Sequence, residues 1–570
     1  MNLYPPELRM TLAPVVALAG DKASQLLIAQ MRASWPKPPA SDALGEWETI
    51  HPHYASLDDA PPVRARDGDG VERPAKSTSE VLKDGWWRKH ALLVPAAAAV
   101  LAPWRADSAW QPIALEVEAT RRRLRAGCKV LVVLVAEGAG TGEPVLIGDE
   151  RVAQLARAAA LEPRALLGMR LQGVASEAMR ASIQRLDRAL VDAADGFYRE
   201  QAKRARRMRE LAPRPSVLAP RYELKAAFFA HARRDGATAE RHYSAAYAML
   251  VEITRARFGV PPATGAAGAS APASALVPPS IAALTVGAVK AAAEVTALQL
   301  VRLLLLAGRI AEAADGWAWH ARVFSALAGD EARPFDAARG PEGGAAHWAW
   351  LARQHYAFAQ LLEAADARAA AAVARQLPAD APVVARSLPA SIEPAYHFER
   401  AAVCARARRA ALPPARSLED SALIVELLTR AYERQRALRR GRQIVGLGEL
   451  MAAEYFACGN YEMAASFYAR VLDAYRRERW HAPAREAANR LRECAARRGR
   501  SSEWVASALG ALPRAVTPDG AEAEALLASL GALVRAEPPS QLPPLQAAVV
   551  ASDELCLLYT SDAADEEDSV

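Results

Sequence analysis

The chain contains 570 residues, of which 52% are apolar, 24% are charged and 6% are aromatic, and it carries a formal net charge of +6. This length suffices for several domains, and the composition is that of a globular protein, which excludes a disordered or fibrous chain. Seven acidic residues and no basic ones lie in the last 19 positions, so the rest of the chain carries about +13. An excess of that size fits an acidic partner or an anionic membrane surface. Nucleic acid is disfavoured, because no stripe of basic residues alternates with aromatic ones.

The cysteines and the apolar runs indicate a soluble cytoplasmic protein. The five cysteines form no CxxC pair and have no nearby histidine at metal-ligand spacing, which is typical of a reducing compartment. They are Cys128, Cys404, Cys458, Cys494 and Cys556. The N-terminus has no signal-peptide pattern. The longest apolar runs, Ala91–Pro103 and Leu298–Ala307, are shorter than the roughly 20 residues that a membrane span requires.

The first 190 residues alternate short apolar runs with helical stretches, which predicts an α/β domain with a mostly parallel sheet. Continuous apolar or β-branched runs predict strands at Pro14–Leu18, Ala91–Val94, Val130–Val135 and Arg164–Met169. Helices are predicted between them, at Lys22–Arg32, Pro112–Ala126 and Glu150–Ala160. Pro52–Thr78 is rich in proline, aspartate, glycine and arginine, so we expect a loop there.

A nucleotide site is the usual ligand site of such a domain, but its sequence signature is missing. Neither GxxxxGK[ST] nor GxGxxG follows a predicted strand. Gly138, Gly140 and Gly142 come after the strand at Val130–Val135, and a glycine-rich turn can cradle a phosphate. However, no lysine follows at the required position, and Pro144 stands where a helix should open. We therefore favour a plain surface loop over a phosphate loop, and we expect no cofactor.

From about residue 191 a 3.6-residue periodicity replaces the strand pattern and predicts helical hairpins. A small residue, an aromatic residue and a third packing residue recur at spacings of four and three in three segments. These are Ala239, Tyr243 and Ala246; Ala313, Trp317 and His320; and Ala464, Tyr468 and Val471. In the last two segments, Gly308 and Gly459 precede the alanine by five residues. The pattern is typical of degenerate tetratricopeptide (TPR) units, so we expect an irregular array.

The predicted organisation is an α/β domain over residues 1–190 followed by a TPR-like α-helical solenoid over residues 191–510, so the chain is predominantly α overall. A helical extension is expected over residues 511–554. Residues 555–570 are expected to be an acidic tail that is either disordered or foreign to the protein. Segments without periodicity predict loops inside the solenoid at Val260–Ser280, Glu331–Gly344 and Leu377–Pro389.

No group of residues predicts catalysis or a metal ion. His51 and His53 lie in a proline-rich segment without a carboxylate partner, which favours solvated side chains over metal ligands. His347 and His355 are eight residues apart on a helix rich in aromatic residues. They lack the spacing of HExxH, and helix packing is favoured over a cofactor box. No GxSxG sequence occurs, and no cysteine has the setting of a nucleophile. We therefore predict that the protein is not an enzyme.

One predicted helix is crowded with basic residues, and we call this set the basic helix patch. Its six members are Arg199, Lys203, Arg204, Arg206, Arg207 and Arg209. The favoured interpretation is a solvated helix face balanced by acidic neighbours such as Glu200 and Glu210. The alternative is a docking patch for an acidic partner or for phospholipid headgroups.

Motifs in several parts of the chain resemble, in order and spacing, the foie gras domain family of the trafficking protein particle (TRAPP) complex. The most extensive motif opens at Arg221 and includes Lys225, Phe228, Phe229, Tyr243 and Tyr247. Upstream, Trp86, Lys89 and His90 are similar to the N-terminal motif of the family. Downstream, Trp350 and Phe358 are similar to its central helix. The resemblance covers roughly Leu12 to Cys494, and these motif residues are candidates for an interface.

The resemblance implies a non-catalytic scaffold subunit of a vesicle-tethering and Rab-GTPase exchange complex that acts in endoplasmic-reticulum-to-Golgi transport and autophagy. The implied partners are other TRAPP subunits and, through the complex, a Rab GTPase. Peripheral contact with Golgi and ER–Golgi intermediate membranes is also implied. The family continues into a long β-rich C-terminal region, so we expect this chain to be a truncated member. His231 stands where the family carries an acidic residue, so a contact made there by a carboxylate would be lost.

The main alternative is a peptide-binding co-chaperone or adaptor of the TPR type. Such proteins line their groove with lysine, arginine and asparagine, which clamp a terminal carboxylate. The corresponding helix here, Thr296–Ala307, offers mostly leucine and a single arginine, Arg302. That composition favours a buried protein interface over a peptide clamp.

Overall fold

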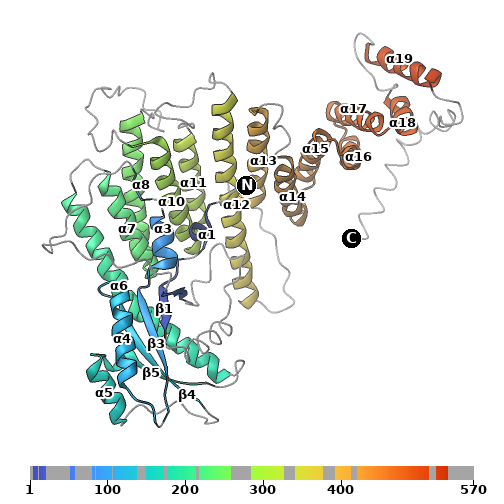
Figure 1. Ribbon diagram of the computed structural model, residues 1–570. Coiled ribbons are helices and arrows are strands. Elements are labelled where there is room, and N and C mark those ends of the chain that lie inside the picture. Colours follow the sequence, from blue (N-terminus) through green and yellow to red (C-terminus); the bar gives the residue numbers. More distant parts are fainter. Residues whose placement is uncertain are drawn as a thin grey trace. The chain divides into compact units, whose positions relative to one another are not determined.

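Figure 1 shows the computed structural model of the chain. The structure describes residues 4–10, 12–20, 52–57, 80–83, 85–105, 107–137, 149–171, 177–212, 217–258, 284–325, 341–376, 392–412, 420–511 and 521–536. The chain divides into two compact units. Unit 1 comprises residues 1–343 and 360–381, and unit 2 comprises residues 344–359 and 382–570.

Unit 1 begins with a five-stranded parallel sheet of strand order β2-β1-β3-β4-β5. The strands are β1 (Val15–Ala19), β2 (His53–Ser56), β3 (Ala97–Pro103), β4 (Lys129–Glu137) and β5 (Leu166–Leu171). β1, β3 and β4 are continuous apolar runs because both faces of the sheet are covered by helices. α4 (Gln111–Arg123) and α5 (Glu150–Ala158) pack on one set of strand side chains. α6 (Glu177–Leu211) contacts β1, β3, β4 and β5.

The strand predictions at Pro14–Leu18 and Val130–Val135 are confirmed, and two others need correction. Ala91–Val94 is not a strand: Lys89–Leu93 forms a single π-helical turn, η1, and the strand starts later, at Ala97. Periodicity does not show where the helical turn ends and the strand begins in this apolar run, because a buried helix and a buried strand give the same pattern in short apolar stretches. β2 lies within the segment predicted to be a loop. It is a four-residue strand, too short to show a pattern.

The helix predictions at Pro112–Ala126 and Glu150–Ala160 correspond to α4 and α5. β5 begins two residues later than expected, because Pro163–Ala165 forms a short 3₁₀ turn, η2. The predicted helix at Lys22–Arg32 and the glycine-rich turn at Gly138–Gly142 lie outside the described residues. The boundary expected at residue 190 falls inside α6, which runs through this position without a break.

The remaining helices follow the predicted α-helical pattern. In unit 1 they are α1 (Pro6–Arg9), α3 (Trp86–Arg88), α7 (Leu218–Ala232), α8 (Gly236–Phe258), α10 (Val286–Leu306) and α11 (Ile310–Ser325). The residues of α12 (Pro341–Gln376) are divided between the two units. Unit 2 continues with α13 (Pro394–Ala410), α14 (Ser421–Ala437), α15 (Gly441–Ala457), α16 (Tyr461–Arg477), α17 (His481–Arg497), α18 (Ser501–Ala511) and α19 (Ala521–Ala536). The predicted fold class, an α/β domain followed by a mostly helical solenoid, is confirmed.

The recurring set of a small, an aromatic and a third packing residue lies on the packed faces of the hairpins. Each of its nine side chains, from Ala239 to Val471, is buried. The alanine lets the adjacent helix approach, and the larger side chains fill the space beside it. The expectation of an irregular array is wrong for α14 to α18, whose first residues are 421, 441, 461, 481 and 501. One helix and its turn therefore repeat every 20 residues in this part of unit 2.

The turns of this regular array share one backbone geometry. The residue that reverses the chain after each of α14 to α17 has a left-handed backbone conformation with positive φ. These residues are Arg439, Gly459, Arg479 and Gly499. After α15, the amide of Gly459 donates to the carbonyl of Phe456 and the amide of Asn460 to that of Tyr455. These two bonds define a Schellman turn, in which glycine is favoured because a β-carbon is strained at positive φ. Arginine at two of the four positions therefore carries strain.

We expect Arg479→Gly to stabilise unit 2 by about 0.5–1 kcal/mol, because glycine adopts the left-handed φ of 57° at this position without strain. The greater conformational entropy of glycine in the unfolded chain offsets part of this gain. Arg479→Ala keeps the β-carbon and is the matched control, for which we expect no gain. Gly459→Ala should destabilise by about 1 kcal/mol. Urea unfolding midpoints measure all three. A gain in Arg479→Ala equal to that in Arg479→Gly would refute backbone strain as the cause.

Candidate interaction site

Two of the motifs resembling the foie gras family, which are far apart in the chain, meet in unit 1. The Trp86 ring, in α3, lies 5.2 Å from the ring of Phe228 and 6.1 Å from that of Phe229, both in α7. His90, in η1, stacks 4.5 Å from Trp86 and lies 5.8 Å from Phe229. Edge-to-face arrangements of this kind stabilise aromatic clusters beyond the area they bury. We call these four rings, together with Trp87, the aromatic junction.

Hydrogen bonds fix the segments on either side of the aromatic junction. Arg221, at the start of α7, donates from Nε to the carbonyl of Val81 over 2.7 Å and from Nη2 to the carbonyl of Glu80. Trp87 donates from its indole nitrogen to the carbonyl of Glu7 over 3.1 Å. Gly85 adopts a left-handed φ of 67° immediately before α3, a conformation that glycine tolerates without strain. Three distant parts of unit 1 are thereby joined.

Lys225 lies at the edge of the aromatic junction. Its ammonium nitrogen is 5.4 Å from the ring centres of both Trp86 and Tyr222, which is the distance of a cation–π contact. Burial lowers the pKa of Lys225 to about 8, and the nearby cations of Arg221, Lys83 and Arg204 add to this effect. Burial also lowers the pKa of His90 to about 3, with the cations of Arg125, Lys225 and Lys89 contributing. His90 is therefore a neutral packing ring at physiological pH.

The two motif tyrosines of α8 each contact a histidine of unit 1; Tyr243 is buried and Tyr247 is half-buried. The hydroxyl of Tyr243 is 3.4 Å from Nδ1 of His231, and that of Tyr247 is 3.1 Å from Nδ1 of His320. Burial lowers the pKa of both histidines to about 3, so both rings are neutral. His231 is only 1% exposed. A side chain at that position packs inside unit 1 and does not reach the surface.

Trp350 and Phe358 belong to unit 2 and are buried there. Phe358 packs edge-on against His397 of α13 at 4.8 Å. Nearby, Tyr356 of α12 meets Phe398 of α13 at 5.9 Å. Phe358 and Tyr356 therefore help to pack α12 on α13.

Most members of the basic helix patch have acidic partners. Arg199 pairs with Asp195 at 2.6 Å, and Arg207 and Lys203 pair with Glu200 at 3.1 and 3.9 Å. Arg209 forms an ion pair with the buried carboxylate of Glu223, which His242 also contacts at 2.6 Å. Arg204 lies near Lys225, and Arg206 is exposed. Four of the six basic side chains are therefore paired with acidic ones.

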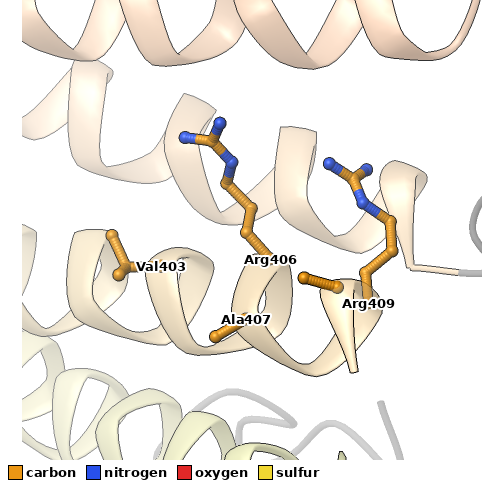
Figure 2. A pocket seen from close by; sticks show the side chains of 5 residues that line it. Val403, Arg406, Ala407 and Arg409 are labelled. Atoms are coloured by element: carbon orange, nitrogen blue, oxygen red, sulfur yellow. The ribbon is translucent and has the colours of Figure 1, made fainter. Parts of the chain in front are cut away.

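Sequence reasoning missed a buried acidic site in unit 2. Glu454 of α15 is fully buried and accepts hydrogen bonds from both terminal nitrogens of Arg409, while Arg406 lies 3.9 Å away. Figure 2 shows the two guanidinium groups extending from the same side of α13. They line a hollow of about 480 Å³ together with Val403, Ala407 and Ala410. The clue in the sequence was an acidic residue within an otherwise apolar helix face, which usually requires a buried partner.

Among the residues that the structure describes, no cluster of three or more histidine, cysteine or acidic side chains could hold a metal ion. The described helices include none with the length and apolarity of a membrane span.

Comparison with known proteins bears on the helical part of the chain. The family model described as Foie gras liver health family 1 matches residues 286–417 and 412–513. Two relatives are named trafficking protein particle complex subunit 11, one from Bos taurus and one from Homo sapiens. Each is 29% identical to this chain over 197 residues, which is 32% of this chain and 17% of the relative. The Gallus gallus protein of the same name is 30% identical over 183 residues, which is 30% of this chain and 16% of the relative. The matched part thus spans less than a fifth of these relatives. The resemblance predicted from the sequence is thus confirmed, and the foie gras family model matches it over residues 286–513.

Proposed function

We propose that this chain is a non-catalytic scaffold subunit of a TRAPP-type vesicle-tethering complex. In this proposal it binds other TRAPP subunits and contributes indirectly to exchange on a Rab GTPase, in endoplasmic-reticulum-to-Golgi transport and in autophagy. The observation that carries the proposal is the family match over residues 286–513, which coincides with the helices α10 to α18. Stacked helical hairpins present extended surfaces to other proteins. The protein would be cytoplasmic and peripheral at Golgi and ER–Golgi intermediate membranes.

The chemistry of the described residues supports a non-catalytic role. Burial raises the pKa of the Cys404 and Cys494 thiols to about 11, so neither is a thiolate nucleophile at neutral pH. His231 and His320, whose pKa values are lowered by burial, are enclosed in helix packing.

The co-chaperone alternative has less support, because the expected clamp arginine is already occupied. Arg302 of α10 is 2% exposed and donates to the carbonyls of Leu8 and Met10 at 3.1 and 2.7 Å. Gln299 donates to the same carbonyl of Leu8 at 3.1 Å. These side chains hold the N-terminal segment against α10 and are not presented to a peptide.

Affinity purification of the tagged full chain from its own cells, followed by mass spectrometry, tests the proposal. We expect other TRAPP subunits to be recovered, and a parallel purification with the tag alone should lack them. Recovery of chaperones without any TRAPP subunit would favour the alternative and contradict the proposal.

A further inference from the structure

A hollow on α13, in unit 2, lies beside the buried carboxylate of Glu454. It measures about 480 Å³ and is lined by Val403, Arg406, Ala407, Arg409 and Ala410. We call these five residues the α13 hollow. Ala410 is exposed and the other four are half-buried, so the hollow is open to solvent. Figure 2 shows the guanidinium groups of Arg406 and Arg409 extending from the same side of the helix.

The two arginines of the α13 hollow share one carboxylate unequally. The terminal nitrogens of Arg409 donate to both carboxylate oxygens of Glu454, and one of them also donates to Oγ of Ser421 at 2.9 Å. Arg406 approaches the same carboxylate with Nε at 3.9 Å from Oε2, which is beyond hydrogen-bond distance. Within the part of the chain that the structure describes, Arg406 makes no hydrogen bond. Its two terminal nitrogens can therefore donate to an incoming acceptor.

The rest of the α13 hollow is apolar and is built from small side chains. Val403, Ala407 and Ala410 follow one another at spacings of four and three, which place them on one face of the helix. Small residues at this spacing allow a second helix to pack closely, as Ala464 does within the hairpins of the same unit. The hollow therefore combines a strip that fits a helix with one cation whose donors are unfilled.

We propose that the α13 hollow is a docking site for a helix of another protein that carries a carboxylate side chain beside aliphatic ones. Arg406, Arg409 and Glu454 together leave one positive charge, which a single carboxylate balances. The carboxylate accepts from the terminal nitrogens of Arg406 in the bidentate geometry that arginine favours. Its aliphatic neighbours cover Val403 and the two alanines. A phosphate group carries nearly two negative charges and brings the excess against Glu454, so the chemistry favours a protein side chain.

Site-specific photocrosslinking of the full chain in its own cells tests the docking site. Benzoylphenylalanine in place of Ala410 puts the photoreactive group at the exposed end of the hollow, and mass spectrometry identifies the segment that it captures. We expect a helical segment of another protein that contains aspartate or glutamate. Ala482, an exposed alanine on α17 of the same unit, is the matched control position. The photoreactive group at Ala482 should not capture that segment.

Charge variants of the photoreactive chain test the role of Arg406. Arg406→Gln should lower the crosslink yield about tenfold, because the captured carboxylate loses its donors. Arg436→Gln removes an exposed arginine from α14 of the same unit and is the matched control, for which we expect an unchanged yield. Ala407→Glu adds a carboxylate to the hollow and should also lower the yield, through repulsion. Circular dichroism establishes that each variant is folded, and Ala407→Glu decides the test if Arg406→Gln is not.

Capture of an acidic segment of another protein, in a yield that depends on Arg406, supports the docking site. The site is overturned by the absence of a crosslink, by capture only of this chain, of a second copy or of a segment without acidic residues, and by a yield that falls equally in Arg436→Gln. The proposal goes beyond the TRAPP assignment and does not rest on it, because it specifies the chemistry of the partner. TRAPP subunits recovered without a crosslink at Ala410 would contradict the site and leave that assignment intact. An acidic segment captured from an unrelated protein, without TRAPP subunits, would do the reverse.

Discussion

Replacing Phe228 with alanine should destabilise unit 1 by about 3–5 kcal/mol, the cost of removing a buried aromatic side chain. Phe228 is 1% exposed and has ring neighbours on several sides. Trp87 lies 5.0 Å away, Trp86 5.2 Å and Phe229 5.5 Å. These rings come from segments that are rigidly placed by the sheet and by α7, so we expect the cavity to collapse only in part.

Urea unfolding, followed by circular dichroism, measures the effect. Leu115→Ala is a suitable control, because Leu115 lies on α4 of the same unit and is 72% exposed. We expect this control to change the free energy of unfolding by no more than about 0.5 kcal/mol. If Phe228→Ala shifted the midpoint as little as Leu115→Ala, the aromatic junction would not be a major source of stability.

The junction should also connect the sheet to the helices. Tyr198 of α6 stacks on Phe229 at 6.2 Å, and its hydroxyl accepts from the amide of Val15 in β1 at 3.0 Å. Loss of Phe228 should therefore increase amide hydrogen exchange in β1 as well as in α7. An effect confined to α7 would show that the two parts are held together elsewhere.

Much of the fold could be predicted from local patterns. Val130–Val135 is apolar throughout and mostly β-branched, so its burial in a parallel strand could be predicted. The recurring spacing of a small, an aromatic and a third packing residue identified packed helix faces at Tyr243, Trp317 and Tyr468, because a helix repeats every 3.6 residues. β2 and the start of β3 could not be predicted from the sequence. β2 is too short for a pattern, and β3 follows a helical turn within one apolar run.

The candidate sites depend on contacts between distant residues, which spacing does not encode. Motif resemblance selected Trp86 and Phe228, but nothing in the sequence shows that their rings meet. The effects of Lys83 on Lys225 and of Arg125 on His90 arise from tertiary packing. The same holds for Glu454 and Arg409, which are 45 residues apart.

The basic helix patch illustrates this difference most clearly. As a sequence it is six positive charges within eleven positions, and it suggested either a solvated face or a docking patch. In the structure, Arg209 forms an ion pair with the buried carboxylate of Glu223. Arg204 instead lies near Lys225, at the edge of the aromatic junction. A count of charges along a helix thus overstates its unpaired charge.

Glu223→Gln should be the second strongly destabilising change, by about 3–5 kcal/mol, because it breaks a buried ion pair and leaves one cation partly unpaired. Glu223 of α7 is 1% exposed and contacts Arg209 of α6 and His242 of α8. It therefore ties three helices of unit 1 together. Glu240→Gln is the matched control, because Glu240 forms a more exposed pair with Arg309 at 2.8 Å. Such a pair is worth about 0–1 kcal/mol.

The pH dependence of stability provides an independent test of Glu223. Burial by itself would raise the pKa of Glu223, but hydrogen bonds from His242 and Arg209 outweigh burial and lower the pKa below its ordinary value of 4.5. The stabilisation is therefore complete above about pH 4.5 and is lost as the pH falls through the lower pKa of the folded state. Glutamine cannot titrate, so the gap in unfolding free energy between wild type and Glu223→Gln should narrow in that acidic range. A gap that stays constant with pH would show that the variant is destabilised by altered packing, without any contribution from the lost charge.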